Sequence, residues 1–451
     1  MKHTWLYITS KDLEIERQQL IDEGRDIREV DNEFKELIAL LRLENDDINL
    51  KERVNALLDK MTHLPMRADY PYYEPSDLKN IQRARPDGPR KLNVNLSDEI
   101  LYDRVLGAWL GRCSGCLLGK PVEGWSSSMM WGYLKDLGQC PLDNYFRSDI
   151  PDKIIQKYNI QPQRAFINQV DHMVEDDDIN YTVANLAMMK QYGQDFTPEN
   201  IATFWMQNIP ILRTCTAERV AYKNFTQLIS PPASAIFRNV YREWIGAQIR
   251  ADFFGYAVLG NPELAAEFAW RDACISHIKN GIYGAMWVAA MLSVAPFIED
   301  IEKVIQIGLS EIPEESRLTK NIKEVINWYE EGISYEEAIT RIHKKWNEKS
   351  PYHWCHTISN AQIVTLGLLW GNGDFEKSIC RAVQACFDTD CNGATVGSII
   401  GMMLGAKKLP RKWIDPLNNK VETGVKGYHL VNISKLAKEG FKLYKIMREN
   451  K

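Results

Sequence analysis

Apolar residues recur at helical spacing through the first 64 residues, between runs of charged side chains. Spacing of i, i+3, i+4 and i+7 places such residues on one face of a helix. The two apolar stripes consist of Phe34, Leu37, Ile38 and Leu41, and of Leu50, Val54, Leu57, Leu58 and Met61. They are too short for a coiled coil, so we expect residues 1–64 to form a charged helical extension that packs on the rest of the protein. A partner-binding arm is the alternative.

A proline-rich segment separates this extension from the remainder of the chain. Residues 65–96 contain Pro65, Pro71, Pro75, Pro86 and Pro89. Since proline removes a backbone donor and disfavours helix, we expect an extended connector that wraps over the surface. From Ser97, a residue suited to a helix N-cap, one helical pattern follows another, and no run of alternating residues indicates a strand. Residues 97–451 are therefore predicted to form one all-α domain.

Two of the predicted helices carry glycine at every fourth position, which places the glycines on one face. The first has Gly107, Gly111, Gly115 and Gly119, and the second has Gly393, Gly397, Gly401 and Gly405. Each glycine inside a helix costs about 1 kcal/mol relative to alanine. We therefore expect a compensating contact between the two helix backbones, which would bring the ends of distant segments together.

The first glycine stripe also contains Cys113 and Cys116 in a C-x-x-C arrangement. A thioredoxin-like redox pair would need a βαβ pattern around it, and this segment is helical. We therefore expect both cysteines to pack in the interior.

The composition is that of an ordinary globular protein, since 45% of the residues are hydrophobic and 25% are charged. The 55 basic and 60 acidic residues give a net charge of −5, so direct nucleic-acid binding is not expected.

The longest nearly apolar run, residues 284–298, is shorter than the roughly 20 residues that span a membrane, and no signal peptide is expected. The nine cysteines are odd in number, which favours a reducing compartment, so we expect a cytoplasmic protein. No pattern indicates an oligomeric state.

Acidic residues stand at the ends of the helical segments. These residues are Glu123, Asp176, Asp177, Asp178, Asp388 and Asp390. Each group alone is typical of helix capping or of a turn. An EF-hand is excluded, because the twelfth position of a loop from Asp388 is Ile399 instead of a bidentate glutamate. If the glycine-striped helices converge, the carboxylates share one pocket and need cations. Oxygen ligands favour Mg²⁺, Ca²⁺ or Mn²⁺, so a two-metal centre is expected.

These segments resemble the ADP-ribosylglycohydrolase family, from about residue 101 to residue 409. The resemblance is carried by GAWLGRCSGCLLGKPVEG at 107–124, EDDDINYTVANL at 175–186, a central segment at 246–291, and a second aspartate motif within 356–401. It implies a compact all-α orthogonal bundle that binds two Mg²⁺ ions, with Mn²⁺ as the alternative. It also implies a metal-dependent hydrolase that cleaves the N- or O-glycosidic bond between ADP-ribose and an acceptor.

The resemblance further implies roles for individual residues. The metal ligands would be Asp176, Asp177, Asp178, Asp388, Asp390 and Cys391. The catalytic residues would be Glu123, Asp177 and Asp390. The substrate-binding residues would be Gly246, Ala247, Gln248, His277, Asn280, Gly281 and Tyr283. Most of the 13 tryptophans are expected in the core, with one or two available to stack on adenine.

Three positions depart from the family pattern. Asp176, Ile179 and Cys391 stand where the family commonly has threonine or, at the last position, serine. A thiol suits a hard cation poorly. The alternatives are a catalytically inactive family member that binds ADP-ribose or a nucleotide, a structural member, or a metal-dependent phosphohydrolase acting on a nucleotide. The acceptor stays open among arginine, serine, a nucleic-acid base and a small nucleotide derivative.

Overall fold

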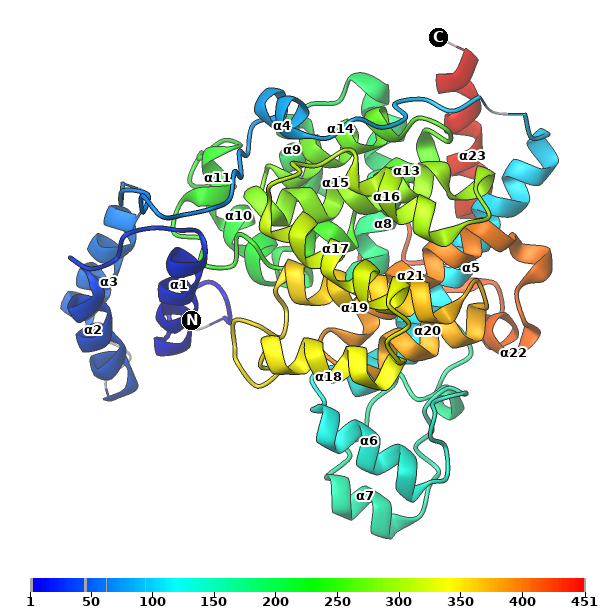
Figure 1. Ribbon diagram of the computed structural model, residues 1–451, viewed down its shortest axis with the longest axis horizontal. Coiled ribbons are helices and arrows are strands. Elements are labelled where there is room, and N and C mark those ends of the chain that lie inside the picture. The colour runs from blue at the N-terminus through cyan, green and yellow to red at the C-terminus, as the bar shows by residue number, and fades with distance from the viewer. Residues whose placement is uncertain (1–2, 44–46, 62, 94, 450–451) are drawn as a thin grey trace.

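Helices make up nearly all of the regular structure, as the sequence predicts (Figure 1). The computed structural model describes residues 3–43, 47–61, 63–93 and 95–449. Within these residues, the only strands are β1 (Lys420–Glu422) and β2 (Leu430–Asn432), which form a short antiparallel hairpin. The predicted all-α, multi-helix bundle is therefore confirmed.

The helices differ widely in length. The helices of nine or more residues are α1 (Ser10–Asp22), α2 (Asp31–Leu43), α3 (Ile48–Met61), α5 (Asp98–Gly119), α6 (Ser127–Asp136), α8 (Asp177–Tyr192), α9 (Pro198–Asn208), α10 (Thr216–Thr226), α14 (Pro262–Ala273), α15 (Lys279–Val294), α16 (Ile301–Leu309), α17 (Arg317–Glu330), α18 (Tyr335–Lys345), α19 (Thr357–Gly371), α20 (Phe375–Gln384), α21 (Thr389–Leu404) and α23 (Ile433–Glu449). The shorter helices are α4 (Leu78–Ala84), α7 (Asp152–Tyr158), α11 (Ala233–Ile236), α12 (Gly246–Ile249), α13 (Asp252–Ala257) and α22 (Arg411–Ile414). Single 3₁₀ turns are η1 (Lys120–Val122), η2 (Ile167–Gln169), η3 (Gly193–Asp195), η4 (Ile211–Arg213), η5 (Ala295–Phe297), η6 (Ala406–Lys408) and η7 (Asp415–Leu417).

Helices α5 and α21 pack backbone against backbone through their glycine stripes. A Cβ atom added to Gly111 would lie 2.1 Å from the carbonyl oxygen of Gly397, and one added to Gly115 would lie 1.9 Å from that of Gly393. Both distances are far below the van der Waals separation of about 3.5 Å. The predicted contact is thus confirmed, and it joins segments almost 300 positions apart in the sequence.

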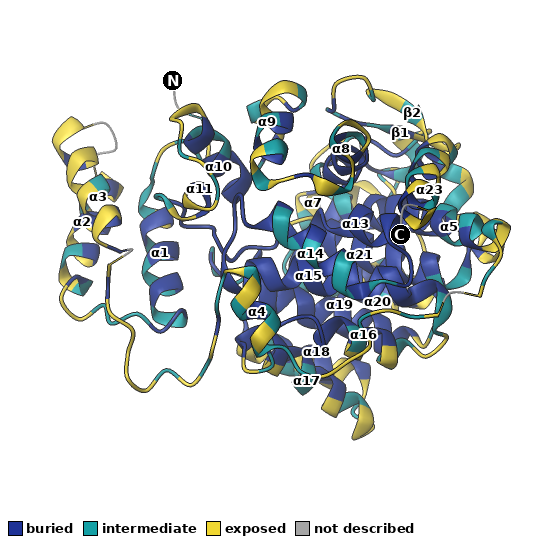
Figure 2. Ribbon diagram, turned by 90° about the horizontal axis from the view of Figure 1, so that it is seen from above, coloured by how far each residue is buried: buried dark blue, intermediate teal, exposed yellow. Residues whose placement is uncertain are grey.

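Helices α15 and α19 complete the centre of the bundle and are buried along their whole length (Figure 2). By length and composition, Lys279–Phe297 is apolar enough to cross a membrane, and it is the only such segment among the described residues. However, 94% of its most apolar window is buried inside the protein. This burial is typical of the core helix of a globular domain.

The N-terminal helices α1, α2 and α3 lie at one side of the bundle (Figures 1 and 2). Every member of the two predicted apolar stripes is buried, so the helical prediction for this part is confirmed. Helix α1 contacts the main body through buried polar groups. Tyr241 donates to Asp12, and Arg242 donates to Glu16 at 2.5 Å and to Glu23 at 2.7 Å. The extension is therefore docked on the body, as expected.

The connector runs along the surface but is not extended throughout. Helix α4 forms between Pro75 and Pro86, where no proline interrupts the backbone, and the Asp77 side chain caps it by accepting from Asn80 N at 3.0 Å. The expectation of a fully extended segment was wrong at this point, because a local cap outweighs the helix-breaking composition around it.

We expect Gly111→Ala to destabilise the protein, because the added methyl group would force the α5 and α21 backbones apart. Overpacking of this kind costs about 1–3 kcal/mol or more. Gly132→Ala in α6 is the control, since its Cβ atom would meet no backbone atom and only the Tyr158 side chain, whose hydroxyl oxygen lies at 2.8 Å and can shift. Thermal unfolding should show a lower midpoint for Gly111→Ala and an almost unchanged one for Gly132→Ala. Equal midpoints for the two variants would contradict the role given to the backbone contact.

Candidate metal centre

The backbone contact places the acidic helix ends next to each other. Asp388 is the N-cap residue of α21, and Asp390 lies in the first turn of this helix. The Thr389 hydroxyl donates to the Gly119 carbonyl oxygen at 2.8 Å, which fixes the start of α21 at the end of α5. Asp176 caps helix α8 by accepting from Asp178 N at 2.9 Å.

The side chains from these helix ends form two overlapping groups. In the first, the ligand atoms of Cys116, Asp176, Asp178 and Asp390 all lie within 4.8 Å of one another. In the second, the same holds for Asp388, Asp390 and Cys391. All of these residues are buried. We call the two groups together the acidic centre. Because Asp390 belongs to both groups, they form one continuous set of buried ligand atoms that could hold metal.

Asp177 and Glu123 lie outside the two compact groups, but the carboxylates of these groups raise the pKa of both side chains. Burial, then Asp176 and Asp390, raise the pKa of Asp177 to about 7. Glu123 is exposed at the end of η1, and the nearby charge of Asp390, with that of Asp176, raises its pKa above the ordinary value. Both carboxyl groups therefore stand close enough to the acidic centre to interact electrostatically with its carboxylates.

The acidic centre carries more negative charge than its surroundings balance. Burial and the Asp176 carboxylate raise the pKa of Asp390 to about 6, and burial with Asp390 raises that of Asp388. The Oδ1 atom of Asp390 is buried without a hydrogen-bond partner among the described residues. A buried carboxylate oxygen left in this state is costly. A bound divalent cation would satisfy it, so the donor set fits a metal.

Two cationic side chains partly neutralise the carboxylates, and the sequence analysis did not identify either of them. Arg112 donates to the Asp178 backbone at 2.8 Å and lies 2.9 Å from Asp252, with no exposed side-chain surface. Lys120 donates to Asp176. Burial disfavours a charged Lys120, but Asp176 and Asp390 raise its pKa above the ordinary value, so it is a fixed cation.

Sulfur and amide groups complete the surroundings of the acidic centre. The Cys391 thiol donates to Asp178 at 3.1 Å, and the Cys355 thiol donates to Asp388 at 3.3 Å. Asn360 accepts from the Asp388 backbone N–H at 3.1 Å and thereby positions this cap residue. Cys116 was expected only to pack. It stands four residues before Lys120, the C-cap residue of α5, and this i, i+4 spacing was the available signal that both face the same site.

The residues predicted to bind substrate are buried in the core. Gly246, Ala247 and Gln248 form most of the short helix α12, and a Cβ atom on Gly246 would meet the Glu218 carboxylate at 2.1 Å. The side-chain amide of Gln248 is buried without a hydrogen-bond partner in the described chain. His277 pairs with the Ser276 hydroxyl at 2.8 Å.

The other members of this predicted set contact the connector or the core. Asn280 donates to Glu74 at 2.9 Å, and Tyr283 donates to the carbonyl oxygen of Pro75. A Cβ atom on Gly281 would lie 2.8 Å from the Arg242 carbonyl oxygen. The structure thus joins Asp176, Asp178, Asp388, Asp390 and Cys391 in one site, and it does not join the seven predicted substrate residues to it. Their role in binding stays a prediction.

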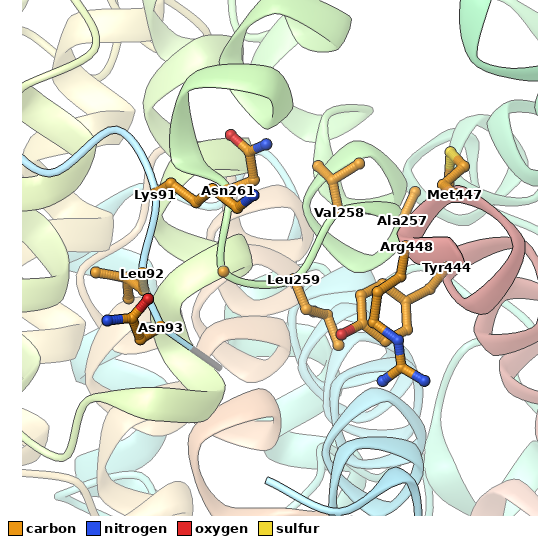
Figure 3. Close-up of a pocket in the computed structure, with 11 residues that line it drawn as sticks. Lys91, Leu92, Asn93, Ala257, Val258, Leu259, Asn261, Tyr444, Met447 and Arg448 are labelled. Atoms are coloured by element: carbon orange, nitrogen blue, oxygen red, sulfur yellow. The ribbon is translucent and has the colours of Figure 1, made fainter. Parts of the chain in front are cut away.

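A cavity of about 230 Å³ lies on another part of the surface (Figure 3). It is formed by the connector at 91–93, the loop at 257–261 and the last turns of α23. Figure 3 shows Leu259 reaching toward Tyr444 and Arg448 across it. None of the acidic-centre residues lines this cavity.

We expect the chelated, metal-free protein to lose stability as the pH rises from about 4 to about 7. The folded-state pKa values of Asp177 and Asp390, about 7 and about 6, exceed the ordinary 3.8, so folding favours their protonated forms. This stabilising contribution is complete below about pH 4 and lost above about pH 7. Asp177→Asn and Asp390→Asn should therefore raise the thermal midpoint more at about pH 8 than at about pH 5. The exposed Asp149→Asn is the control, and a pH-independent difference would contradict the expectation.

Comparison with known proteins identifies a family for this chain. The family model described as ADP-ribosylglycohydrolase matches residues 97–448, which is well over half of the chain. One similar solved structure, described as an ADP-ribosylglycohydrolase-related protein complex, is 17% identical, with 77% of this chain and 99% of that chain covered and a TM-score of 0.47. No curated protein sequence matches. By the extent of the family match, the protein belongs to the ADP-ribosylglycohydrolase family, whose members hydrolyse ADP-ribose linkages.

Proposed function

We propose that the protein hydrolyses the glycosidic bond between ADP-ribose and an acceptor, with two divalent cations bound in the acidic centre. The observation that carries this proposal is the shared carboxylate, Asp390, in two groups of buried ligand atoms from α5, α8 and α21. Mg²⁺ is the cation that the family resemblance suggests, with Mn²⁺ as the alternative. Cations bound there would hold ribose hydroxyl groups and a water molecule close to the anomeric carbon.

Within this proposal, Asp176, Asp178, Asp388 and Asp390 hold the cations. Asp177 begins helix α8 directly beside them and provides a further carboxylate. Cleavage of a glycosidic bond passes through an oxocarbenium-like transition state and needs a proton donor or acceptor at the leaving group. Glu123 is exposed beside the acidic centre, so its carboxyl group is placed to exchange a proton with a leaving group held there. We assign it the acid–base role.

A cavity of about 490 Å³ is lined by Gly124 and Phe387, the chain neighbours of Glu123 and Asp388, and offers room for part of the substrate. Its aromatic side chains are Trp125, Trp354 and Phe387. Trp125 lies two residues after Glu123, and Phe387 directly precedes Asp388. Base–aromatic stacking contributes about 1–3 kcal/mol per base. We propose that the adenine ring stacks here, so that the diphosphate extends toward the acidic centre.

The N-terminal extension also lines this cavity. Helix α1 supplies Lys11 and Glu14, although it lies outside the segment that matches the family. Glu14 pairs with Arg42 at 2.6 Å, whereas Lys11 and Lys349 have no carboxylate of the described residues within ion-pair distance. Unpaired ammonium groups attract phosphate. The extension would thereby contribute to the binding of the diphosphate.

All nine cysteines are free. Thiols beside a metal site persist in a reducing compartment, so we propose that the protein acts in the cytoplasm.

The double substitution Asp388→Ala with Asp390→Ala should abolish release of ADP-ribose from ADP-ribosylated substrates in the presence of Mg²⁺. Loss of two ligands, one of them shared, should reduce the rate on the order of 100-fold or more. Chromatographic quantification of free ADP-ribose measures the effect, and the exposed Glu99→Ala is the matched control. Activity that survives the double substitution would refute the proposal. Tight ADP-ribose binding without turnover would favour an inactive member, and phosphate release would favour a phosphohydrolase.

Trp354→Ala should weaken ADP-ribose binding about ten-fold or more through loss of stacking, and Trp354→Phe should retain most of the affinity. Titration calorimetry with ADP-ribose measures both. Trp328→Ala is a suitable control, because Trp328 is also half-buried but lies on α17, outside this cavity. An unchanged affinity in Trp354→Ala would place the adenine elsewhere.

A further inference from the structure

Each group of the acidic centre contains one sulfur atom among its oxygens. Cys116 comes from α5 and joins Asp176, Asp178 and Asp390, while Cys391 comes from α21 and joins Asp388 and Asp390. The Cys116 side chain is fully buried and that of Cys391 is 6% exposed. Neither thiol takes part in a disulfide. Two thiols therefore stand at ligand distance inside a site that is otherwise built of carboxylates.

An independent observation indicates that this arrangement is suited to a cation. Asp390, the member common to both groups, is 3% exposed, and its Oδ1 atom has no hydrogen-bond partner in the described residues. The cationic side chains nearby are already engaged, since Lys120 bonds to Asp176 and Arg112 to Asp178. Neither of them satisfies the free oxygen of Asp390.

The ligand chemistry determines which cation suits the site. Mg²⁺ requires near-octahedral oxygen coordination and gains little from sulfur. Zn²⁺ and Co²⁺ are borderline in softness and accept mixed sets of thiolate and carboxylate ligands at low coordination number. The first group, with one sulfur and three carboxylates, has the composition of a four-coordinate site of this kind.

We propose that Cys116 and Cys391 are metal ligands and that they make the acidic centre select a borderline divalent cation such as Zn²⁺ over Mg²⁺. On binding, a metal–sulfur bond forms at each thiol and the S–H proton leaves to solvent. The proposal rests on the proposed function only in that it uses the same carboxylates. It concerns the identity of the cation and not the reaction that follows.

The test is a titration of the chelated full-length protein with Co²⁺, followed by near-ultraviolet absorption. Sulfur bound to Co²⁺ gives a charge-transfer band that carboxylate oxygen alone does not give. We expect the band in the unmodified protein, a weaker band in Cys116→Ser or Cys391→Ser, and no band in the double variant. Cys140→Ser is the matched control, because Cys140 is exposed and outside both groups, and it should leave the band intact.

A second measurement separates sulfur coordination from the general preference of proteins for later transition metals. Zn²⁺ binds most nitrogen, oxygen or sulfur sites more tightly than Mg²⁺ does. The informative quantity is therefore the change in the ratio of Zn²⁺ to Mg²⁺ affinity, measured by competition calorimetry. We expect this ratio to fall at least about ten-fold in Cys116→Ser and in Cys391→Ser.

Bound Co²⁺ without a sulfur band in the unmodified protein would overturn the proposal, as would an unchanged affinity ratio in both single variants. If either single variant fails to fold, the spectrum of the unmodified protein still decides between the outcomes. ADP-ribose release with Mg²⁺ combined with no sulfur band would reject this proposal and leave the proposed function standing. A sulfur band without release of ADP-ribose from any substrate would support this proposal and reject the proposed function.

Discussion

The contact between the α5 and α21 backbones is the constraint on which the acidic centre depends. Side chains on these faces would keep the helix axes apart, whereas glycine lets the carbonyl oxygen of one helix approach the Cα atoms of the other. The end of α5 is thereby fixed beside the start of α21, where Thr389 bonds to the Gly119 carbonyl oxygen. Carboxylates repel one another, so they stay together only on a frame that cannot relax. The paired glycine helices provide this frame.

The charge balance of the centre explains why the frame alone is insufficient. The four aspartates of the centre and the neighbouring Asp177 face two engaged cationic side chains, Arg112 and Lys120. Full ionisation of these five carboxyl groups would leave an excess of three negative charges. Arg112 is in addition shared with Asp252. Without further cations, the excess is relieved by proton uptake, as the raised pKa values of Asp177 and Asp390 show. Divalent cations would relieve it without protons and leave the carboxylates free to act as ligands.

The sequence predicts those parts of the fold and of the site that rest on periodicity. The glycine spacing of four predicted the helix pair, and the aspartates at helix starts predicted which side chains would meet. Cys116 and Lys120 escaped prediction because their role depends on which face of α5 turns toward α8, and a helix buried on all sides has no polar face that indicates this. Helix α4 and the contacts of Asn280 and Tyr283 depend on the path of a connector without periodicity, so they follow from tertiary structure alone.

Two thiols and one ammonium group stand around the carboxylates and the neighbouring cavity. Cys116 and Cys391 belong to the two groups of possible ligand atoms, and α1 brings Lys11 to the cavity that Gly124 and Phe387 line. In the functions proposed above, the thiols influence what the carboxylates bind, and Lys11 influences which groups a substrate meets on entering. Since the glycine frame is independent of all three, the ligand set and the cavity wall can change while the helices that hold the carboxylates remain fixed. The family match therefore accounts for the frame, and cation and substrate preference depend on the residues placed around it.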